Sequence, residues 1–314
     1  MNGIGSTIQK ATVVPIAFGS WDFQVEQPVP ILPKEDVFIE DTRGLLSTSD
    51  FDLWQKYIPE KEIKNLSSFR LALVQRFLSP VHTGNKEEQK SKELLHHIFV
   101  CLRVVRPTRA QFQAIQFKIL DDRKIDIFSV TQPRNIPIVI PQSDALNSIR
   151  SSDIATLCAV VESFLDLLRN GPANIRRAVR YYNTGYQDVP DPIVQVMLWT
   201  AGIEAVVSSG AEIRRPQVVE KVYELIGADW NIYEDSAVKE FTHANVKVAE
   251  VVRDLFHLRS RLVHGGWIPD EWLDRKGRPG MPDNVSYPDL LREAASAVLR
   301  KLLMGWLLSH RIPN

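Results

Sequence analysis

The spacing of hydrophobic residues changes near residue 150. Before that point, short runs rich in Val, Ile and Phe have the length and composition of β-strands, and prolines separate them. After it, apolar residues recur at the three- and four-residue spacing of amphipathic helices. We therefore predict an α+β protein, with a mixed α/β domain over residues 1–150 and an all-α domain over residues 151–314.

The N-terminal part contains predicted strands and one long predicted helix. The strands are expected at 11–18, 36–41, 112–120 and 124–130, and the helix at 86–105. The segment DDRK at 121–124 lies between the last two strands and favours a β-hairpin. Prolines of this part are assigned to loops, namely Pro28, Pro30, Pro33, Pro107, Pro133, Pro137 and Pro141.

Start and stop signals mark the helices predicted for the C-terminal part. Ser151-Ser152-Asp153 precedes the first helix, which is expected to end at Asn170-Gly171-Pro172. Asp191 and Pro192 supply an N-cap and a proline at the first helical position of a later helix, PIVQVMLWTAGIEAVVSSG. The remaining helices are expected at 174–186, 215–227, 236–263 and 287–309.

The helical segment 248–264 contains a charge in an unusual place. Its apolar residues share one side, and they are Val248, Val251, Val252, Leu255, Phe256, Leu258, Leu262 and Val263. Arg259 falls near the middle of that side, where an unpaired guanidinium would cost on the order of several kcal/mol. Glu204 is equally out of place in the apolar helix VMLWTAGIEAVV. We predict that Glu204 and Arg259 form an ion pair between two helices. Alternatively, both long side chains reach solvent at the helix edges.

His264 is followed directly by Gly265-Gly266, which favours a helix end at this point. An imidazole in the last turn lies near the negative end of the helix macrodipole, and imidazole can both accept and donate a proton near neutral pH. His264 is therefore a candidate for proton transfer. The simpler hypothesis is that it only caps the helix.

Composition and charge narrow the classes of function. The chain of 314 residues carries 38 Lys and Arg against 38 Asp and Glu. Residues 1–150 hold 19 basic and 17 acidic residues, which leaves 19 basic and 21 acidic residues for the C-terminal part. If that part binds RNA, its positive charge must be concentrated at a small site rather than spread over a broad surface.

Cysteine usage and apolar run lengths indicate the compartment. Cys101 and Cys158 each lie in an apolar run, which argues against a disulfide framework or a Cys-based zinc site. The N-terminus does not resemble a signal peptide, and no apolar run approaches the roughly 18 residues of a membrane-spanning helix. We expect a cytoplasmic protein without a membrane segment.

The string LFHLRSRLVHGG at 255–266 resembles the characteristic helix of HEPN domains, in particular the Apea-like branch. It contains Arg259, four intervening residues and then His264. The resemblance covers about residues 170–310, which include a helix with an internal Glu, an intervening helix, the Arg-and-His helix and a long terminal helix. It implies a compact helical bundle that forms a homodimer in which two such helices face each other.

Many HEPN proteins are metal-independent endoribonucleases of toxin–antitoxin, abortive-infection and other antiviral systems. The resemblance implies that Arg259 contacts and stabilises phosphate, that His264 transfers protons, and that Ser260 takes the polar position after the arginine, which is often Asn, Asp or His in active members. Glu204 would support Arg259. The implied partners are RNA, a second copy of the chain and an antitoxin or regulatory protein, without a cofactor, a membrane or DNA. Further candidate RNA contacts are His257, Arg261, Arg275, Lys276 and Arg278.

Cleavage of RNA without a metal needs a base for the 2′-OH, an acid for the 5′-oxygen and a cation beside the phosphorane. His and Arg can supply these groups, but residues five apart lie about 140° apart around a regular helix. Arg259 and His264 of one regular helix would therefore not point at one phosphate. The site needs either an irregular helix end at Gly265-Gly266 or the facing helix of a second subunit.

Three further groups of residues have side chains of the kinds found in binding sites. Metal binding at the shared face of His257, Arg261 and His264 is not expected, because Asp254 is the nearest carboxylate and does not complete a zinc-like set. His96-His97 is predicted to be a half-buried helix turn rather than a ligand pair. A basic and aromatic cluster would suit RNA stacking, but we favour tyrosines packed in the core and solvated arginines. Its members are Arg176, Arg177, Arg180, Tyr181, Tyr182 and Tyr186.

Two hypotheses of function follow from these observations. The first is an endoribonuclease or RNA-binding effector whose N-terminal domain senses a signal or restrains the nuclease. The second is a catalytically silent helical interaction module, in which Arg259 is a structural ion-pair member and His264 a cap. An enzyme activity of the N-terminal domain itself is disfavoured, because that domain has no Gly-rich phosphate loop, serine elbow or paired metal-ligand motif.

Overall fold

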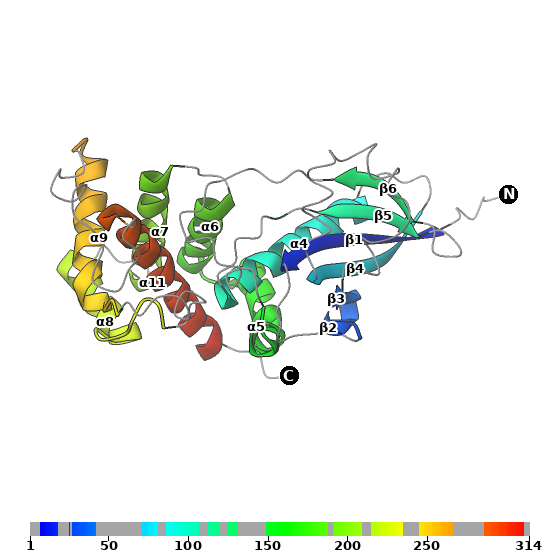
Figure 1. Cartoon of the computed structure of the whole chain (residues 1–314), viewed down its shortest axis with the longest axis horizontal. Coiled ribbons are helices and arrows are strands. Elements are labelled where there is room, and N and C mark those ends of the chain that lie inside the picture. Colours follow the sequence, from blue (N-terminus) through cyan, green and yellow to red (C-terminus); the bar gives the residue numbers. More distant parts are fainter. Residues whose placement is uncertain are drawn as a thin grey trace. The chain divides into compact units, whose positions relative to one another are not determined.

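The computed structural model describes residues 7–17, 25, 27–41, 71–80, 86–106, 112, 114–119, 125–130, 149–187, 191–208, 215–234, 245–266 and 286–310. These residues have the predicted α+β character, with an antiparallel sheet and a larger set of helices (Figure 1). They divide into two compact units between Glu162 and Ser163. We call the part before that division the sheet unit and the part after it the helical unit. The domain boundary after residue 150 stays a prediction.

The sheet unit is built on six described strands. They are β1 (Thr7–Ala17), β2 (Val29–Leu32), β3 (Val37–Asp41), β4 (Leu71–Pro80), β5 (Ile115–Ile119) and β6 (Ile125–Val130). Their order across the sheet is β2-β3-β4-β1-β5-β6, and each neighbouring pair is antiparallel. Thr12 of β1 lies opposite Gln75 of β4 and Gln116 of β5. Because directly paired residues share a face, these three side chains form a polar row across the sheet.

The predicted strands at 11–18, 36–41, 112–120 and 124–130 are confirmed as β1, β3, β5 and β6. The assignment of Pro30 to a loop is wrong, because this residue lies within β2. β2 is an edge strand, where a residue without an N–H is tolerated. β4 was not predicted. Its residues Leu71 to Gln75 are all buried, so the strand lacks the alternation of apolar and polar positions that marks a half-exposed strand.

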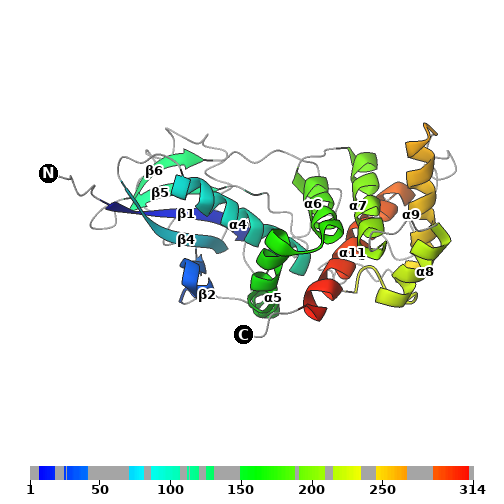
Figure 2. The ribbon, with the colours of Figure 1, turned by 180° about the vertical axis from the view of Figure 1, so that it is seen from behind.

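The helix α4 (Lys86–Val105) packs against β1 and β4 and has the predicted bounds (Figure 2). Glu87 and Glu88 lie in its first turn and Arg103 in its last turn, where these charges complement the helix macrodipole. Its buried side is mostly apolar, with Leu95, Ile98, Phe99 and Leu102 fully enclosed. The buried side of α4 therefore forms the core of this unit together with the apolar residues of the strands.

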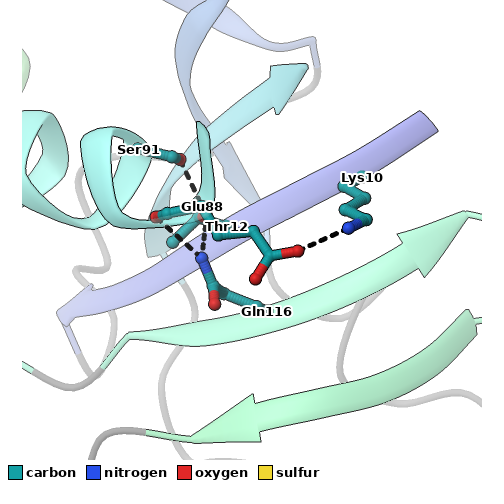
Figure 3. A network of polar contacts seen from close by, with 5 residues as sticks. All are labelled: Lys10, Thr12, Glu88, Ser91 and Gln116. Atoms are coloured by element: carbon teal, nitrogen blue, oxygen red, sulfur yellow. Dashed lines mark hydrogen bonds and ion pairs between the residues drawn. The ribbon is translucent and has the colours of Figure 1, made fainter. Parts of the chain in front are cut away.

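A buried polar network joins the first turns of α4 to the sheet (Figure 3). Ser91 Oγ donates to Thr12 Oγ1 at 2.7 Å, and Gln116 Nε2 lies 3.2 Å from the same oxygen and 3.0 Å from the Glu88 carbonyl oxygen. The Lys10 ammonium forms an ion pair with the Glu88 carboxylate. All five residues are buried, so each polar group depends on its partners in the protein instead of on water. The network thereby fixes the position of α4 along β1 and β5.

The helical unit contains the last part of α5 (Ser151–Asn170) and several complete helices. These are α6 (Ala173–Gln187), α7 (Pro192–Val207), α8 (Arg215–Ile226), α9 (Val248–Val263) and α11 (Tyr287–Ser309). α11 contacts α6, α7, α8 and α9, and most of its residues are buried, so it forms the centre of this unit (Figure 1). The predicted cap of α7 is confirmed, since the Asp191 carboxylate accepts a hydrogen bond from the Ile193 N–H at 2.8 Å.

The sequence predicted one helix over residues 236–263, but α9 begins only at Val248. The prediction is therefore wrong for residues 245–247, which are described and are not helical. Asn231 and Lys247 form an isolated β-bridge, and the Ile232 N–H donates to the Val246 carbonyl oxygen at 3.0 Å. These contacts hold residues 245–247 in an extended form up to the helix start. Residues 235–244 lie outside the described part of the chain.

No helix among the described residues is long and apolar enough to span a lipid bilayer.

We predict that Thr12→Val lowers the free energy of unfolding by about 1–3 kcal/mol, because it removes the acceptor of two buried donors. Thr156→Val is the matched control, since the Thr156 hydroxyl bonds only to the Ser152 carbonyl oxygen on an exposed surface, and its expected effect is within about 0.5 kcal/mol. Urea denaturation of both variants measures the difference. Equal effects of the two substitutions would contradict the role of the network.

Candidate functional site

The orientation of α9 is set by its apolar side. Its buried apolar residues are Val248, Val251, Val252, Leu255, Phe256 and Leu258, as predicted. Leu262 is only half-buried, and the Val263 side chain is 55% exposed although it lies on the apolar side of the helix. The last turn of α9 is therefore not packed into the core. The polar residues at this end of the helix are accessible to a ligand or partner.

The predicted ion pair between Glu204 and Arg259 is confirmed. Arg259 Nη1 donates to Glu204 Oε1 between α9 and α7, at side-chain exposures of 31% and 27%. Both groups are thus half-buried rather than enclosed, and solvent screens part of their attraction. The pair fixes the direction of the guanidinium and links the helix of the candidate site to its neighbour.

His264 is the C-cap of α9, and Gly265 adopts a left-handed conformation with φ 73°. The Gly265 N–H donates to the Leu262 carbonyl oxygen at 3.2 Å, and the Gly266 N–H donates to the Arg261 carbonyl oxygen at 2.7 Å. These two bonds form a Schellman motif, which confirms the predicted helix end. The His264 side chain is exposed.

The structure does not bring Arg259 and His264 together within one chain. α9 is regular through Val263, and its backbone departs from helical geometry at His264, with φ −93° and ψ 16°, and at Gly265, with φ 73°. The two side chains therefore leave the helix about 140° apart. The predicted irregular helix end is present, but no contact between the Arg259 and His264 side chains is seen among the described residues, so the facing helix of a second subunit stays a prediction.

A second group of candidate residues does share one face of α9. Arg261 Nε lies 3.4 Å from His257 Nε2, and both side chains are exposed. His264 lies on the same side, since seven residues complete almost two helical turns from His257. Ser260 is half-buried on this side. The accessible face of α9 thus presents two imidazoles and the guanidinium groups of Arg261 and Arg253, without Arg259.

Asp254 has a structural partner that the sequence pattern did not indicate. The hydroxyl of Tyr287, the first residue of α11, donates to the Asp254 carboxylate, and the Tyr287 ring is fully buried. This bond ties α9 to the centre of the helical unit. The described residues contain no cluster of three or more His, Cys, Asp or Glu side chains that could hold a metal ion.

The basic and aromatic cluster of α6 divides as predicted for its arginines and for two of its three tyrosines. Tyr182 and Tyr186 are buried, their rings pack edge to face at 5.1 Å, and Trp199 Nε1 donates to the Tyr182 carbonyl oxygen at 3.1 Å. The three arginines Arg176, Arg177 and Arg180 are exposed. Tyr182 and Tyr186 therefore belong to the core and are not available to stack on RNA bases, whereas Tyr181 is half-buried. His96 and His97 are half-buried, as predicted.

A groove of about 390 Å³ lies between α8 and α9, which are neighbours in both views of the molecule (Figures 1 and 2). Its lining residues are Pro216, Val219, Glu220, Tyr223, Arg253, Phe256 and His257. Except for His257, none of them was a predicted site residue. They could not be recognised as a set, because the groove exists only where the two helices pack against each other. The candidate contacts Arg275, Lys276 and Arg278 lie outside the described residues.

Comparisons of the chain with models of protein families, with characterised proteins and with solved structures found no match. The resemblance to HEPN domains therefore depends on the residues around Arg259 and His264 and on the order of the helices.

A double-mutant cycle tests the Glu204–Arg259 pair. We expect Glu204→Gln and Arg259→Gln to be coupled by about 0.5–1 kcal/mol at low salt and by less in concentrated salt, because the pair is half-exposed. The exposed pair of Lys247 and Asp229 is the control, and its coupling should be smaller. Additive single effects for Glu204 and Arg259, measured by chemical denaturation, would show that the pair has no energetic role.

Two glycine substitutions test the end of α9. Gly265→Ala should lower the free energy of unfolding by about 1–2 kcal/mol, because alanine is strained at a positive φ. Gly305 lies within α11 on its exposed side, and no atom lies near the methyl group that an alanine would add there. Gly305→Ala should therefore raise the free energy of unfolding by about 0.5–1 kcal/mol. Thermal and urea unfolding measure both changes. The same sign for both variants would be inconsistent with the assigned backbone at Gly265.

Proposed function

We propose that the helical unit is a HEPN-type endoribonuclease that cleaves single-stranded RNA without a metal ion, in a defence or toxin–antitoxin system. The proposal is supported most strongly by one arrangement on α9. Arg259 is held in a fixed direction by Glu204, while His264 is exposed at the helix end, five positions along the sequence. This is the residue pair, in the order and spacing, that the resemblance to HEPN domains assigns to catalysis.

The proposed reaction is an attack of the ribose 2′-oxygen on the adjacent phosphorus. A base removes the 2′-OH proton, the bond from phosphorus to the 5′-oxygen breaks, and an acid protonates that oxygen. The products are a 2′,3′-cyclic phosphate and a 5′-hydroxyl. His264 moves the protons, and the Arg259 guanidinium stabilises the negative charge of the phosphorane.

The active form in this proposal is a homodimer. Because Arg259 and His264 of one chain leave α9 about 140° apart, Arg259 of one copy must meet His264 of the other. The exposed Val263 is adjacent to His264 and would be covered when two α9 helices face each other. In this scheme the sheet unit serves as the sensor or regulatory part. An antitoxin or regulatory protein is a partner of the whole protein.

A second candidate is a catalytically silent interaction module. The observation that favours it is the ion pair itself, because a guanidinium bound to Glu204 already has a structural role. Under this alternative, His264 is only the C-cap of α9, and its replacement leaves every function intact.

Incubation of the purified protein with end-labelled single-stranded RNA in the presence of EDTA tests the proposal. We expect cleavage to 2′,3′-cyclic phosphate ends, and we expect His264→Ala to abolish it with an unchanged melting temperature. His310→Ala is a matched control, because His310 is also an exposed histidine at the C-cap of a helix. Full cleavage by the His264 variant, or intact RNA with the wild-type dimer, would refute the nuclease and favour the silent module.

A further inference from the structure

We infer that the groove between α8 and α9 binds one nucleotide of single-stranded RNA and selects a base that carries an exocyclic amine. The inference rests on the proposed function, since it supplies the base preference of that nuclease. It depends on residues outside the proposed catalytic pair and is tested separately.

The groove has an apolar floor and a polar rim. Val219 of α8 and Phe256 of α9 are buried and form the floor, while Glu220, Arg253 and His257 are exposed. The volume of about 390 Å³ falls in the range of roughly 300–1,000 Å³ that is typical of small-ligand sites. The helix spacing explains the arrangement, because the lining residues fall at three- and four-residue intervals on facing sides of the two helices.

Three side chains match groups of a nucleotide, two of them the base and one the phosphate. Tyr223 is half-buried, so its ring can stack on a base of any sequence. Arg253 supplies a guanidinium suited to a phosphate group. The Glu220 carboxylate can only accept hydrogen bonds when ionised, so it favours a base edge that carries an amine, as in cytosine, over the carbonyl of uracil.

The charged rim residues are available to a ligand. Within the described part of the chain, neither Arg253 nor Glu220 forms an ion pair or a side-chain hydrogen bond. The groove also continues into the accessible face of α9, since His257 lines the groove and Arg261 lies 3.4 Å from its ring nitrogen. His264 follows on the same side of the helix. An RNA strand with one base in the groove would therefore run along α9 toward the proposed site of cleavage.

The charge balance of the helical part agrees with such a local site. The chain beyond residue 150 has 19 basic and 21 acidic residues, so a broad electrostatic surface for RNA is not available. Recognition must instead come from a few directed contacts. In the groove these are the stacking of one base, one contact to a phosphate and one contact to the amine of the base.

Binding of RNA hexamers with 2′-O-methyl groups tests the inference, because these strands cannot be cleaved by 2′-oxygen attack. Fluorescence anisotropy with the full-length protein should show oligo-C bound about tenfold more tightly than oligo-U. Glu220→Gln should bring the two affinities close to each other, because the amide can donate to the uracil carbonyl as well as accept from cytosine. Tyr223→Ala and Arg253→Ala should each weaken binding of both strands about tenfold.

Matched controls separate these effects from general charge changes. Glu224→Gln alters an exposed carboxylate one turn further along α8, outside the groove, and Arg169→Ala removes an exposed arginine of α5. Both should leave the affinities and the preference for oligo-C unchanged. Melting temperatures of the Glu220, Arg253, Glu224 and Arg169 variants should equal that of the wild type, since these four residues are exposed.

The outcomes distinguish the inference from the proposed nuclease. A preference for oligo-C that Glu220→Gln removes supports the groove, even if the protein cleaves no RNA. A protein that cleaves RNA but binds both strands equally, or keeps its preference in the Glu220 variant, overturns the groove and leaves the nuclease intact. Absence of any RNA binding by the wild type overturns both.

Discussion

The burial of one side of α9 is the constraint on which the candidate site depends. Val248, Val251, Leu255 and Phe256 must face the core, and this fixes the rotation of the helix. With the rotation fixed, the directions of all polar side chains of α9 follow from its 3.6-residue period. Arg259 is directed to Glu204 on α7, whereas the side that bears His257 and His264 faces solvent. The separation of the two proposed catalytic groups is thus a consequence of core packing.

Several contacts around α9 make this orientation rigid. Tyr287 of α11 donates to Asp254, Glu204 of α7 accepts from Arg259, and the Schellman motif at Gly265 ends the helix directly after His264. The first two contacts tie α9 to two neighbouring helices, and the third fixes the residue at which α9 ends. The groove beside α8 and the exposed helix end therefore have fixed positions relative to each other, as a strand-binding surface requires.

The parts of the structure that local signals specify could be predicted from the sequence. Asp191-Pro192 and His264-Gly265-Gly266 set helix ends through interactions within a few residues, and an arginine in an apolar stripe indicated a partner that proved to be Glu204. Features that depend on distant contacts could not be predicted. β2 tolerates Pro30 because it is an edge strand, and the start of α9 depends on the bridge between Asn231 and Lys247. The groove and the exposure of Val263 likewise depend on which helices pack against α9.

The central claim is that Arg259 of one copy acts with His264 of the other, and complementation between two inactive variants tests it most directly. Arg259→Ala and His264→Ala proteins are unfolded and refolded together, and RNA cleavage is measured with EDTA present. If the site is shared, each mixed dimer regains one intact site, and the mixture recovers about a quarter of the wild-type activity. A mixture that stays as inactive as the separate variants, with mixed dimers verified, would contradict the account.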